Sequence, residues 1–539
     1  DTIATVEQSI RCIEAGSELI RITAPSKNEA ENLLNIKNEL RKRGYTTPLV
    51  ADIHFTPNAA EIAARIVEKV RINPGNYIDR KKFEIIEYTE AEYKAEIERI
   101  RQRFTPLVKI CKEYGTAMRI GTNHGSLSDR IMSRYGDTPM GMVESAMEFL
   151  RIARDESYHQ IVLSMKASNP LVMVQAYRLL VKTMFDEFDE SYPLHLGVTE
   201  AGDGEDGRIK SAIGIGTLLE DGLGDTIRVS LTEDPEFEIP VCKDLVKRHE
   251  AESGKSKNEI SVPSVDRITY NPFSYQRRET FEVSNIGGKQ VPVIVADLSK
   301  VEEITPKHLR SVGYTYDEPN DKWHIGDMAA DFIFCNQLIH FPLPGTLKII
   351  CNYKIRQNAG DKGKYFPLLD GEQYLEETMQ KSSSINFVMI DCYSPGYEQP
   401  SLAKLFEKLK KDNTANICLS SVNKNSMQSI RRMLIELMNN GVKNPAIIIT
   451  GSSDDTTDES LIHYAVESGA LFLDGFLDGI WLGHHFGNGT HPTDNKWFNS
   501  VAFSILQATR TRISKTEYIS CPSCGRTLFD LQQTTAKIR

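Results

Sequence analysis

The sequence predicts an α/β fold whose first part is a (β/α)₈ barrel, a TIM barrel. Two observations support this prediction. The first 240 residues repeat one order, in which a short apolar run is followed by a polar cluster and then by a helical pattern. The apolar runs are of the type found in buried strands and they alternate with helical patterns, as is typical of βα units around a parallel sheet. There are seven such runs, at residues 18–23, 48–53, 69–73, 117–121, 160–164, 193–197 and 225–230.

Seven strands are one fewer than a closed (β/α)₈ barrel contains. We expect the remaining strand to precede Asp1, and we expect the natural chain to continue at both ends. The barrel is assigned to residues 1–250. A segment of charged and small residues at 250–258 is typical of a domain boundary.

A second α/β region is assigned to residues 263–510 and is predicted to be an inserted second barrel-like α/β domain. Helical stretches separate its apolar runs, and no chemically convincing cluster of side chains stands out. Residues 511–539 are assigned to the start of a third, small domain. The strand-like runs of the second region are at 291–296, 331–334, 347–350, 386–390, 416–420, 446–449 and 470–473.

Composition excludes several classes of function. The chain has 539 residues and a formal net charge of −10, which argues against nonspecific nucleic-acid binding because that mode needs a basic face. No apolar run approaches the ~20 residues of a membrane span. The nine cysteines are scattered, so no disulfide framework is indicated and a reducing compartment is expected.

Positively charged side chains stand at the carboxyl ends of several predicted strands, where parallel barrels carry their active sites. A single arginine there is usually solvated, but five cations on separate strands would meet at one mouth and repel one another. An anion such as a diphosphate would neutralise them. These cations are Arg21, Arg71, Arg119, Lys166 and Arg228, and the polar residues at the same mouth are Asp52, His54, Asn123 and Ser230.

Glu200 lies between Gly197 and Gly202 in the loop that follows the sixth predicted strand. Glycines allow the backbone to approach a ligand closely. A carboxylate beside a cationic mouth could act as a proton donor or base. The structural alternative is an ion pair that holds one of the arginines in place.

Cys521 and Cys524 form a Cys-Pro-Ser-Cys motif near the C-terminus. Two thiolates at this spacing are half of a zinc or iron–sulfur site, which needs about four ligands. No further Cys or His follows Cys524. The other ligands therefore come either from upstream in the chain or from residues beyond Arg539.

Nine segments together resemble the 4-hydroxy-3-methylbut-2-enyl diphosphate synthase family in order and spacing. The resemblance is dense over 1–240 and clear over 515–539, and the intervening region is similar to the extra domain of the long, three-domain members. The matching segments are 51–55, 71–76, 119–126, 166–168, 195–202, 210–216, 228–235, 521–527 and 530–539.

The resemblance implies an enzyme of the methylerythritol phosphate route to isoprenoids. The family opens the ring of 2-C-methyl-D-erythritol 2,4-cyclodiphosphate and removes a hydroxyl as water in a two-electron reduction. Electrons come from ferredoxin or flavodoxin through a 4Fe–4S cluster. A homodimer is implied, located in the bacterial cytoplasm or, for a plant member, in a plastid.

The resemblance also assigns roles to residues. Glu200 would supply or relay a proton, and Cys521 and Cys524 would bind the cluster at the start of a small α+β iron–sulfur domain. The remaining cluster ligands of the family, a Cys and a Glu, are expected beyond Arg539. The diphosphate would be held by Arg21, Arg71, Arg119, Asn123, Lys166, Arg228 and Ser230, with Asp52 and His54 lining the same mouth.

Two alternatives stay open at the level of the sequence. A cluster-free barrel enzyme acting on a phosphorylated substrate would use the same cations. A zinc-ribbon interaction module fused to a scaffold would use the Cys pair, although it would need a second pair.

Overall fold

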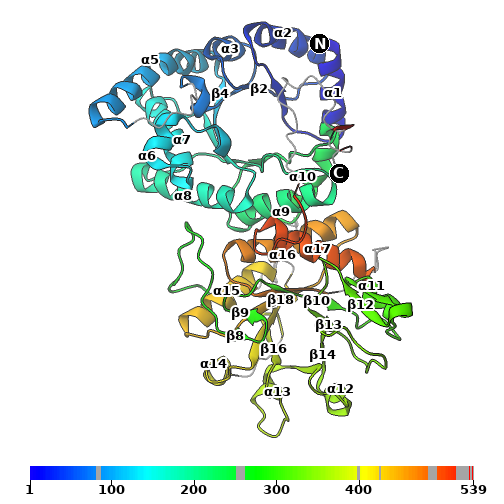
Figure 1. Ribbon diagram of the computed structural model, residues 1–539. Helices are drawn as coiled ribbons and strands as arrows, with labels where there is room; N and C mark the ends of the chain where they lie inside the picture. Colours follow the sequence, from blue (N-terminus) through cyan, green and yellow to red (C-terminus); the bar gives the residue numbers. More distant parts are fainter. Residues whose placement is uncertain are drawn as a thin grey trace. The chain divides into compact units, whose positions relative to one another are not determined.

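The computed structural model describes residues 1–79, 87–249, 262–396, 401–423, 426–483, 494–517, 533–534 and 537. The chain forms two compact units, one that contains Asp1–Lys247 and one that spans Arg248–Glu517. Each unit is built around parallel strands with helices on the outside (Figure 1). The units are described separately below.

The first unit contains all seven predicted strands. Five form one parallel sheet in chain order, and a parallel bridge between Leu163 and Leu194 leads from the fifth strand to the sixth. β6 and β7 pair in parallel, and within the described residues β1 and β7 are the end strands of the series. The strands are β1 (Ile20–Thr23), β2 (Leu49–Ile53), β3 (Lys69–Ile72), β4 (Ala117–Asn123), β5 (Ile161–Lys166), β6 (His195–Leu196) and β7 (Thr226–Ile227).

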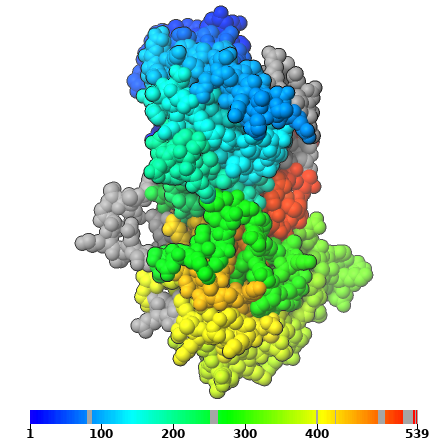
Figure 2. Space-filling view, turned by 90° about the vertical axis from the view of Figure 1, so that its left-hand side faces the viewer, coloured from blue at the N-terminus to red at the C-terminus, as the bar shows by residue number. Residues whose placement is uncertain are grey.

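Helices alternate with these strands and lie outside the sheet (Figure 1). Their ends follow local signals: Thr89 forms a capping box with Glu92, and Gly115 ends the same helix with a left-handed φ of +69°. The helices are α1 (Thr2–Glu14), α2 (Lys27–Lys42), α3 (Pro57–Ala63), α4 (Pro74–Tyr77), α5 (Glu90–Tyr114), α6 (Asp129–Tyr135), α7 (Pro139–Asp155), α8 (Pro170–Phe188), α9 (Gly204–Glu220) and α10 (Glu238–Lys247). The light-blue and cyan segments, which include α5 and α7, form one continuous outer surface (Figure 2).

The second unit is a closed barrel of eight parallel strands, so the predicted barrel-like region is confirmed. Its interior is apolar; Phe332 and Phe387, for example, meet edge to face with ring centroids 5.5 Å apart. The strands are β10 (Val293–Asp297), β13 (Phe332–Phe334), β14 (Lys348–Asn352), β15 (Tyr365–Leu369), β16 (Asn386–Asp391), β17 (Ala415–Ser420), β18 (Ala446–Thr450) and β19 (Gly479–Leu482).

Helices and two short hairpins complete this unit. The hairpins are β8 (Glu282–Val283) with β9 (Ile286–Gly287), and β11 (Tyr314–Asp317) with β12 (Lys322–Ile325). The helices are α11 (Pro306–Arg310), α12 (Tyr353–Asn358), α13 (Gly371–Leu375), α14 (Leu402–Leu409), α15 (Ser426–Asn439), α16 (Thr457–Leu473) and α17 (Asn495–Ala508).

One predicted strand of the second unit is wrong, and two strands of its barrel and the four short hairpin strands were not predicted. Residues 470–473 are the last turn of α16, a helix that is buried along most of its length, so its apolar run carries no helical period. β15 was missed because Pro367 interrupts it, and proline is unusual within a sheet. β19 is the strand that closes the barrel by pairing with both β18 and β10.

No helix in the described ranges is long and apolar enough to cross a membrane.

Candidate active site

The register of the parallel strands brings the predicted cations of the first unit to one end of the sheet. Arg71 on β3 is the register partner of Arg119 on β4, and Asp52 on β2 is the partner of Arg71. Four residues beyond Arg119 on the same strand, Asn123 is the register partner of Lys166. Because side chains alternate between faces along a strand, charged residues two positions apart share the inner face. The predicted mouth is therefore a real cluster of side chains.

Asp52 organises one side of this cluster. Its carboxylate is fully buried and accepts hydrogen bonds from Arg21 at 2.7 Å and from Arg71 at 2.9 Å. His54 Nε2 lies 3.4 Å from the same carboxylate. Burial alone would raise the pKa of Asp52, but Arg71 and Arg21 outweigh it and hold that pKa well below its usual value. Asp52 is thus ionised and fixes two arginines.

Arg119 and Lys166 lack such a partner. They are only 3% and 5% exposed, and in the described residues no hydrogen bond or salt bridge reaches the Arg119 guanidinium or the Lys166 ammonium. Buried charges are normally paired. Burial first, and then Arg71, lower the pKa of Arg119 to about 9. Burial, followed by Arg119 and Arg228, lowers the pKa of Lys166 well below its usual value.

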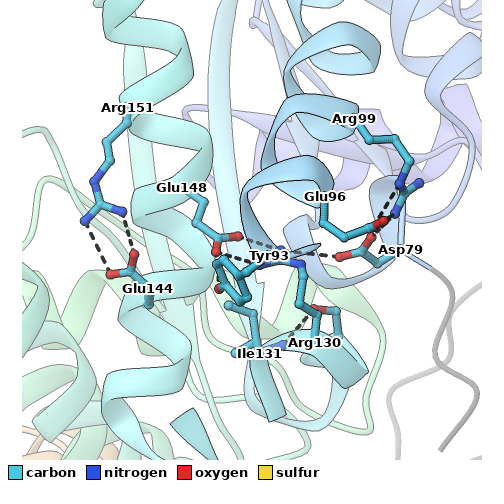
Figure 3. A network of polar contacts seen from close by, with 10 residues as sticks. Asp79, Tyr93, Glu96, Arg99, Arg130, Ile131, Glu144, Glu148 and Arg151 are labelled. Carbon is cyan, nitrogen blue, oxygen red and sulfur yellow. Dashed lines mark hydrogen bonds and ion pairs between the residues drawn. The ribbon is translucent and has the colours of Figure 1, made fainter. Parts of the chain in front are cut away.

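A paired arginine in the same unit shows the contrast. Arg130 on α6 is equally buried, but both of its terminal nitrogens bond to Glu148, at 2.7 and 2.6 Å. Tyr93 and Asp79 complete this network (Figure 3). Glu148 helps to raise the pKa of Arg130 against the effect of burial. Arg119 therefore differs from Arg130 in having no partner among the described residues, although both are equally buried.

Arg228 and Ser230 follow β7, and Glu238 at the start of α10 supports their loop. One carboxylate oxygen of Glu238 accepts the backbone N–H of Leu231 at 3.0 Å, and the other lies 3.7 Å from Arg228 Nε. Burial raises the pKa of Glu238. Glu238 was not predicted from the sequence, because an acidic residue at the start of a helix does not by itself indicate a functional site. Ser230 is buried beside this loop.

Two glycines leave space for the cations. A Cβ atom at Gly121 would lie 2.5 Å from Arg71 Nε, and one at Gly197 would lie 2.8 Å from Lys166 Nζ. Any larger residue would displace these side chains. Arg71 also donates a hydrogen bond to the Gly121 carbonyl oxygen at 2.8 Å. Glycine is therefore required at both positions by the close approach of a charged group.

Glu200 has a strained backbone, with a φ of +54° that non-glycine residues rarely adopt. The loop is held nearby, because Glu233 accepts the Gly204 N–H at 3.0 Å and binds both terminal nitrogens of Arg208. In the described part of the chain no hydrogen bond or ion pair engages the Glu200 carboxylate. The structural alternative, in which Glu200 holds an arginine, therefore finds no support among these residues.

Asn123 lies at the end of β4 and is held through its backbone. Ser126 Oγ donates to the Asn123 carbonyl oxygen at 3.2 Å and accepts from Asn73 Nδ2 at 2.9 Å. The Asn123 side chain is left available to a ligand, since no described residue hydrogen-bonds to it.

The described cysteines do not form a metal site. All seven are free; six are buried and Cys242 is half-buried. Burial raises the pKa of each thiol, for example that of Cys242 to about 11, which disfavours the thiolate that binds metals. No group of three or more potential metal ligands occurs among the described residues. Cys521 and Cys524 lie outside them.

Comparison with known proteins places the whole chain in one family. A family model described as the GcpE TIM-barrel domain matches residues 1–243. A Parabacteroides distasonis protein named 4-hydroxy-3-methylbut-2-en-1-yl diphosphate synthase (flavodoxin) is 46% identical over 544 residues, covering 100% of this chain and 82% of its own. A Leptospira interrogans protein with the same name is 43% identical, and the match covers 82% of its length. An Arabidopsis thaliana protein named 4-hydroxy-3-methylbut-2-en-1-yl diphosphate synthase (ferredoxin), chloroplastic, is 41% identical, and the match covers 74% of its length.

We predict opposite stability effects for two buried arginines. Arg119→Met removes an unpaired charge and should raise the free energy of unfolding by about 1–3 kcal/mol, whereas Arg130→Met leaves Glu148 unpaired and should lower it by about 3–5 kcal/mol. Hydrogen exchange of β3 and β4 under increasing urea measures both. Destabilisation by Arg119→Met as large as that by Arg130→Met would mean that Arg119 has a partner.

We also predict that anion binding is coupled to protonation of Lys166. Because the pKa of Lys166 is lowered in the free fold, its charged form is disfavoured there. The free energy of unfolding of the free protein should therefore fall as the pH falls from 10.5, the ordinary pKa of a lysine, towards the lowered pKa of Lys166. A bound anion stabilises the charged form, so affinity for inorganic diphosphate should decrease as the pH rises from about 7 to about 10, by at most about tenfold per pH unit. Calorimetry measures this slope, and Lys166→Met should flatten it; equal slopes would contradict the coupling.

Proposed function

This chain belongs to the 4-hydroxy-3-methylbut-2-en-1-yl diphosphate synthase family, and we propose that the cationic mouth of its first unit binds 2-C-methyl-D-erythritol 2,4-cyclodiphosphate. The chain is accordingly an oxidoreductase of isoprenoid biosynthesis that acts with flavodoxin or ferredoxin. The reaction opens the cyclic diphosphate, removes one hydroxyl as water and gives 4-hydroxy-3-methylbut-2-enyl diphosphate.

One observation carries the assignment of the mouth as the diphosphate site. Arg119 and Lys166 are buried cations for which the described residues supply no hydrogen-bond acceptor. A diphosphate offers several charged oxygens and would satisfy both groups at once. The negative charge of the ligand would also offset the mutual repulsion of the five cations.

The other residues divide into oriented cations and neutral donors. Arg21 and Arg71 are held by Asp52, and Arg228 lies near Glu238, so their guanidinium groups are fixed before the ligand arrives. Less side-chain entropy is therefore lost when the ligand binds. Asn123 and Ser230 would donate neutral hydrogen bonds, and His54 would line the mouth beside Asp52.

Glu200 is proposed as the group that delivers a proton to the departing hydroxyl. Loss of hydroxide is slow, and protonation of the leaving oxygen by a positioned acid accelerates it. The strained backbone at Glu200 and the absence of any described ion pair to its carboxylate support this role, because strain of this kind concentrates at functional sites.

Cys521 and Cys524 are proposed as two ligands of a 4Fe–4S cluster, which supplies the electrons when bound. Their Cys-x-x-Cys spacing supports this proposal, as do the raised thiol pKa values of the described cysteines, which leave these two as the suitable pair. The bacterial relatives are named for flavodoxin and the plant relative for ferredoxin, which supports flavodoxin as the donor and the bacterial cytoplasm as the location.

Glu200→Gln tests the acid role. Gln keeps the size of the side chain but cannot donate the proton, so turnover of the cyclic diphosphate should fall by about 100- to 10,000-fold while the Kd for substrate stays nearly constant. Glu190→Gln is the control, because Glu190 is exposed and pairs with Arg154 away from the mouth. Turnover of Glu200→Gln close to that of Glu190→Gln would reject Glu200 as the acid.

Cys521→Ser and Cys524→Ser test the cluster. Protein expressed from the complete coding sequence and purified without oxygen should contain about four irons per chain, and each substitution should remove most of this iron and its visible absorption. Cys242→Ser, at the least buried described cysteine, should leave both unchanged. A protein with one zinc and no iron would instead identify a zinc site.

A further inference from the structure

His195 is a fixed residue of the mouth for which the proposed function gives no role. It lies on β6 opposite Thr226 of β7 in the parallel register. The two side chains are bonded, with His195 Nδ1 2.8 Å from Thr226 Oγ1. Tyr177 of α8 donates a hydrogen bond from its hydroxyl to the His195 carbonyl oxygen. Both the ring and the backbone of His195 are therefore held in place.

Lys166 lies beside the face that His195 presents. Gly197 is two residues further along the chain, and residues two apart in an extended segment point to the same side. The Lys166 ammonium lies 2.8 Å from the position of a Cβ atom at Gly197, so it occupies the space next to His195 on that side. Absence of a side chain at Gly197 is what allows this approach.

The charged groups that act most strongly on His195 all carry positive charge. They come from four strands of the sheet: Lys166 of β5, Arg119 of β4, Lys69 of β3 and Arg21 of β1. The buried carboxylate of the mouth, Asp52, is already bonded to Arg21 and Arg71. The groups from β7 and α8, Thr226 and Tyr177, are neutral hydrogen-bonding partners.

This environment keeps the ring uncharged in the free protein. Burial, and then Lys166 and Arg119, hold the pKa of His195 well below its usual value. A further positive charge would add to a cluster in which the cations outnumber the carboxylates. A bound diphosphate would reverse the sign of the local field, and the same position would then favour an imidazolium.

We propose that His195 is a positioning residue of the diphosphate site, neutral beside Lys166 in the free protein and protonated when a diphosphate occupies the mouth. The inference rests on the proposed function, because it requires an anion at Arg119 and Lys166. The contact between Nδ1 and Thr226 Oγ1 fixes the ring. In the imidazolium both ring nitrogens are donors, so Nδ1 donates to Thr226 Oγ1 and Nε2 can donate to the ligand. The site thus gains one positive charge only when a ligand is present.

Proton uptake on binding tests this proposal directly. Inorganic diphosphate is titrated by calorimetry in pairs of buffers with different ionisation enthalpies, at about pH 6 and about pH 8. Wild-type protein should take up about half a proton more than His195→Gln at about pH 6, with little difference at about pH 8. Protons that diphosphate itself gains or loses are shared by both proteins and cancel in the comparison.

His159→Gln is the matched control. His159 is a histidine of the same unit that stacks on Tyr192, with its Nδ1 2.7 Å from the Tyr192 hydroxyl, and it does not take part in the mouth. This variant should take up as many protons as wild type. The uptake difference would then belong to His195 and not to histidine loss in general.

The outcomes separate the two proposals. No binding of inorganic diphosphate by wild-type protein at either pH would overturn the proposed diphosphate site. Binding with equal proton uptake in wild type and His195→Gln would overturn the role of His195 alone.

A second measurement does not depend on the folding of a variant. In wild-type protein with ¹³Cε1-labelled histidine, one resonance should be neutral at about pH 6 and should shift to the imidazolium position when diphosphate is added. Thr226→Val should weaken this shift, because it removes the partner of Nδ1. Twelve histidines that respond identically with and without diphosphate would contradict the proposal.

Discussion

Charge balance at the end of one parallel sheet is the constraint on which this site depends. Parallel pairing places Arg71 next to Arg119 and brings Lys166 to the same end of the sheet. Cations from different strands therefore lie close together. In a buried setting their repulsion costs several kcal/mol. Asp52 compensates two arginines and Glu238 lies near a third. Arg119 and Lys166 have no counterpart among the described residues, and an anion would supply one and favour the charged form of Lys166.

The backbone around the mouth is adapted to this charge arrangement. Gly121 and Gly197 lie where a side chain would collide with Arg71 and Lys166, and both are therefore consequences of where the cations point. At Glu200 the backbone itself is unusual, with a left-handed φ of +54°. This conformation costs about 1–3 kcal/mol, and the hydrogen bonds of Glu233 with Gly204 and Arg208 hold the loop in which it occurs. The fixed arginines and the strained backbone of Glu200 are typical of a site that is organised before a ligand binds.

Much of this site could be predicted from the sequence, because strand ends and alternation are local properties. The seven strands of the first unit and the cations at their ends follow from short apolar runs with a charged residue at a fixed position. Pairing could not be predicted, since it depends on long-range contacts. Nothing local shows that Asp52 holds both Arg21 and Arg71, or that Glu238 reaches the loop of Arg228. In the second unit, residues 470–473 were misassigned for a similar reason, because a buried helix and a buried strand share an apolar composition.

The second barrel shows that topology alone does not create the chemistry. Its eight strands close, and its interior is filled by apolar side chains such as Phe332, Phe387 and Trp481. In the first unit, buried positions on neighbouring strands hold Arg71 and Arg119 instead. Closing a barrel over an apolar core is stabilising in itself. Burying cations that lack a partner among the described residues is not. Groups of this kind concentrate at functional sites, and this cost in stability is therefore the physical reason to propose a ligand site here.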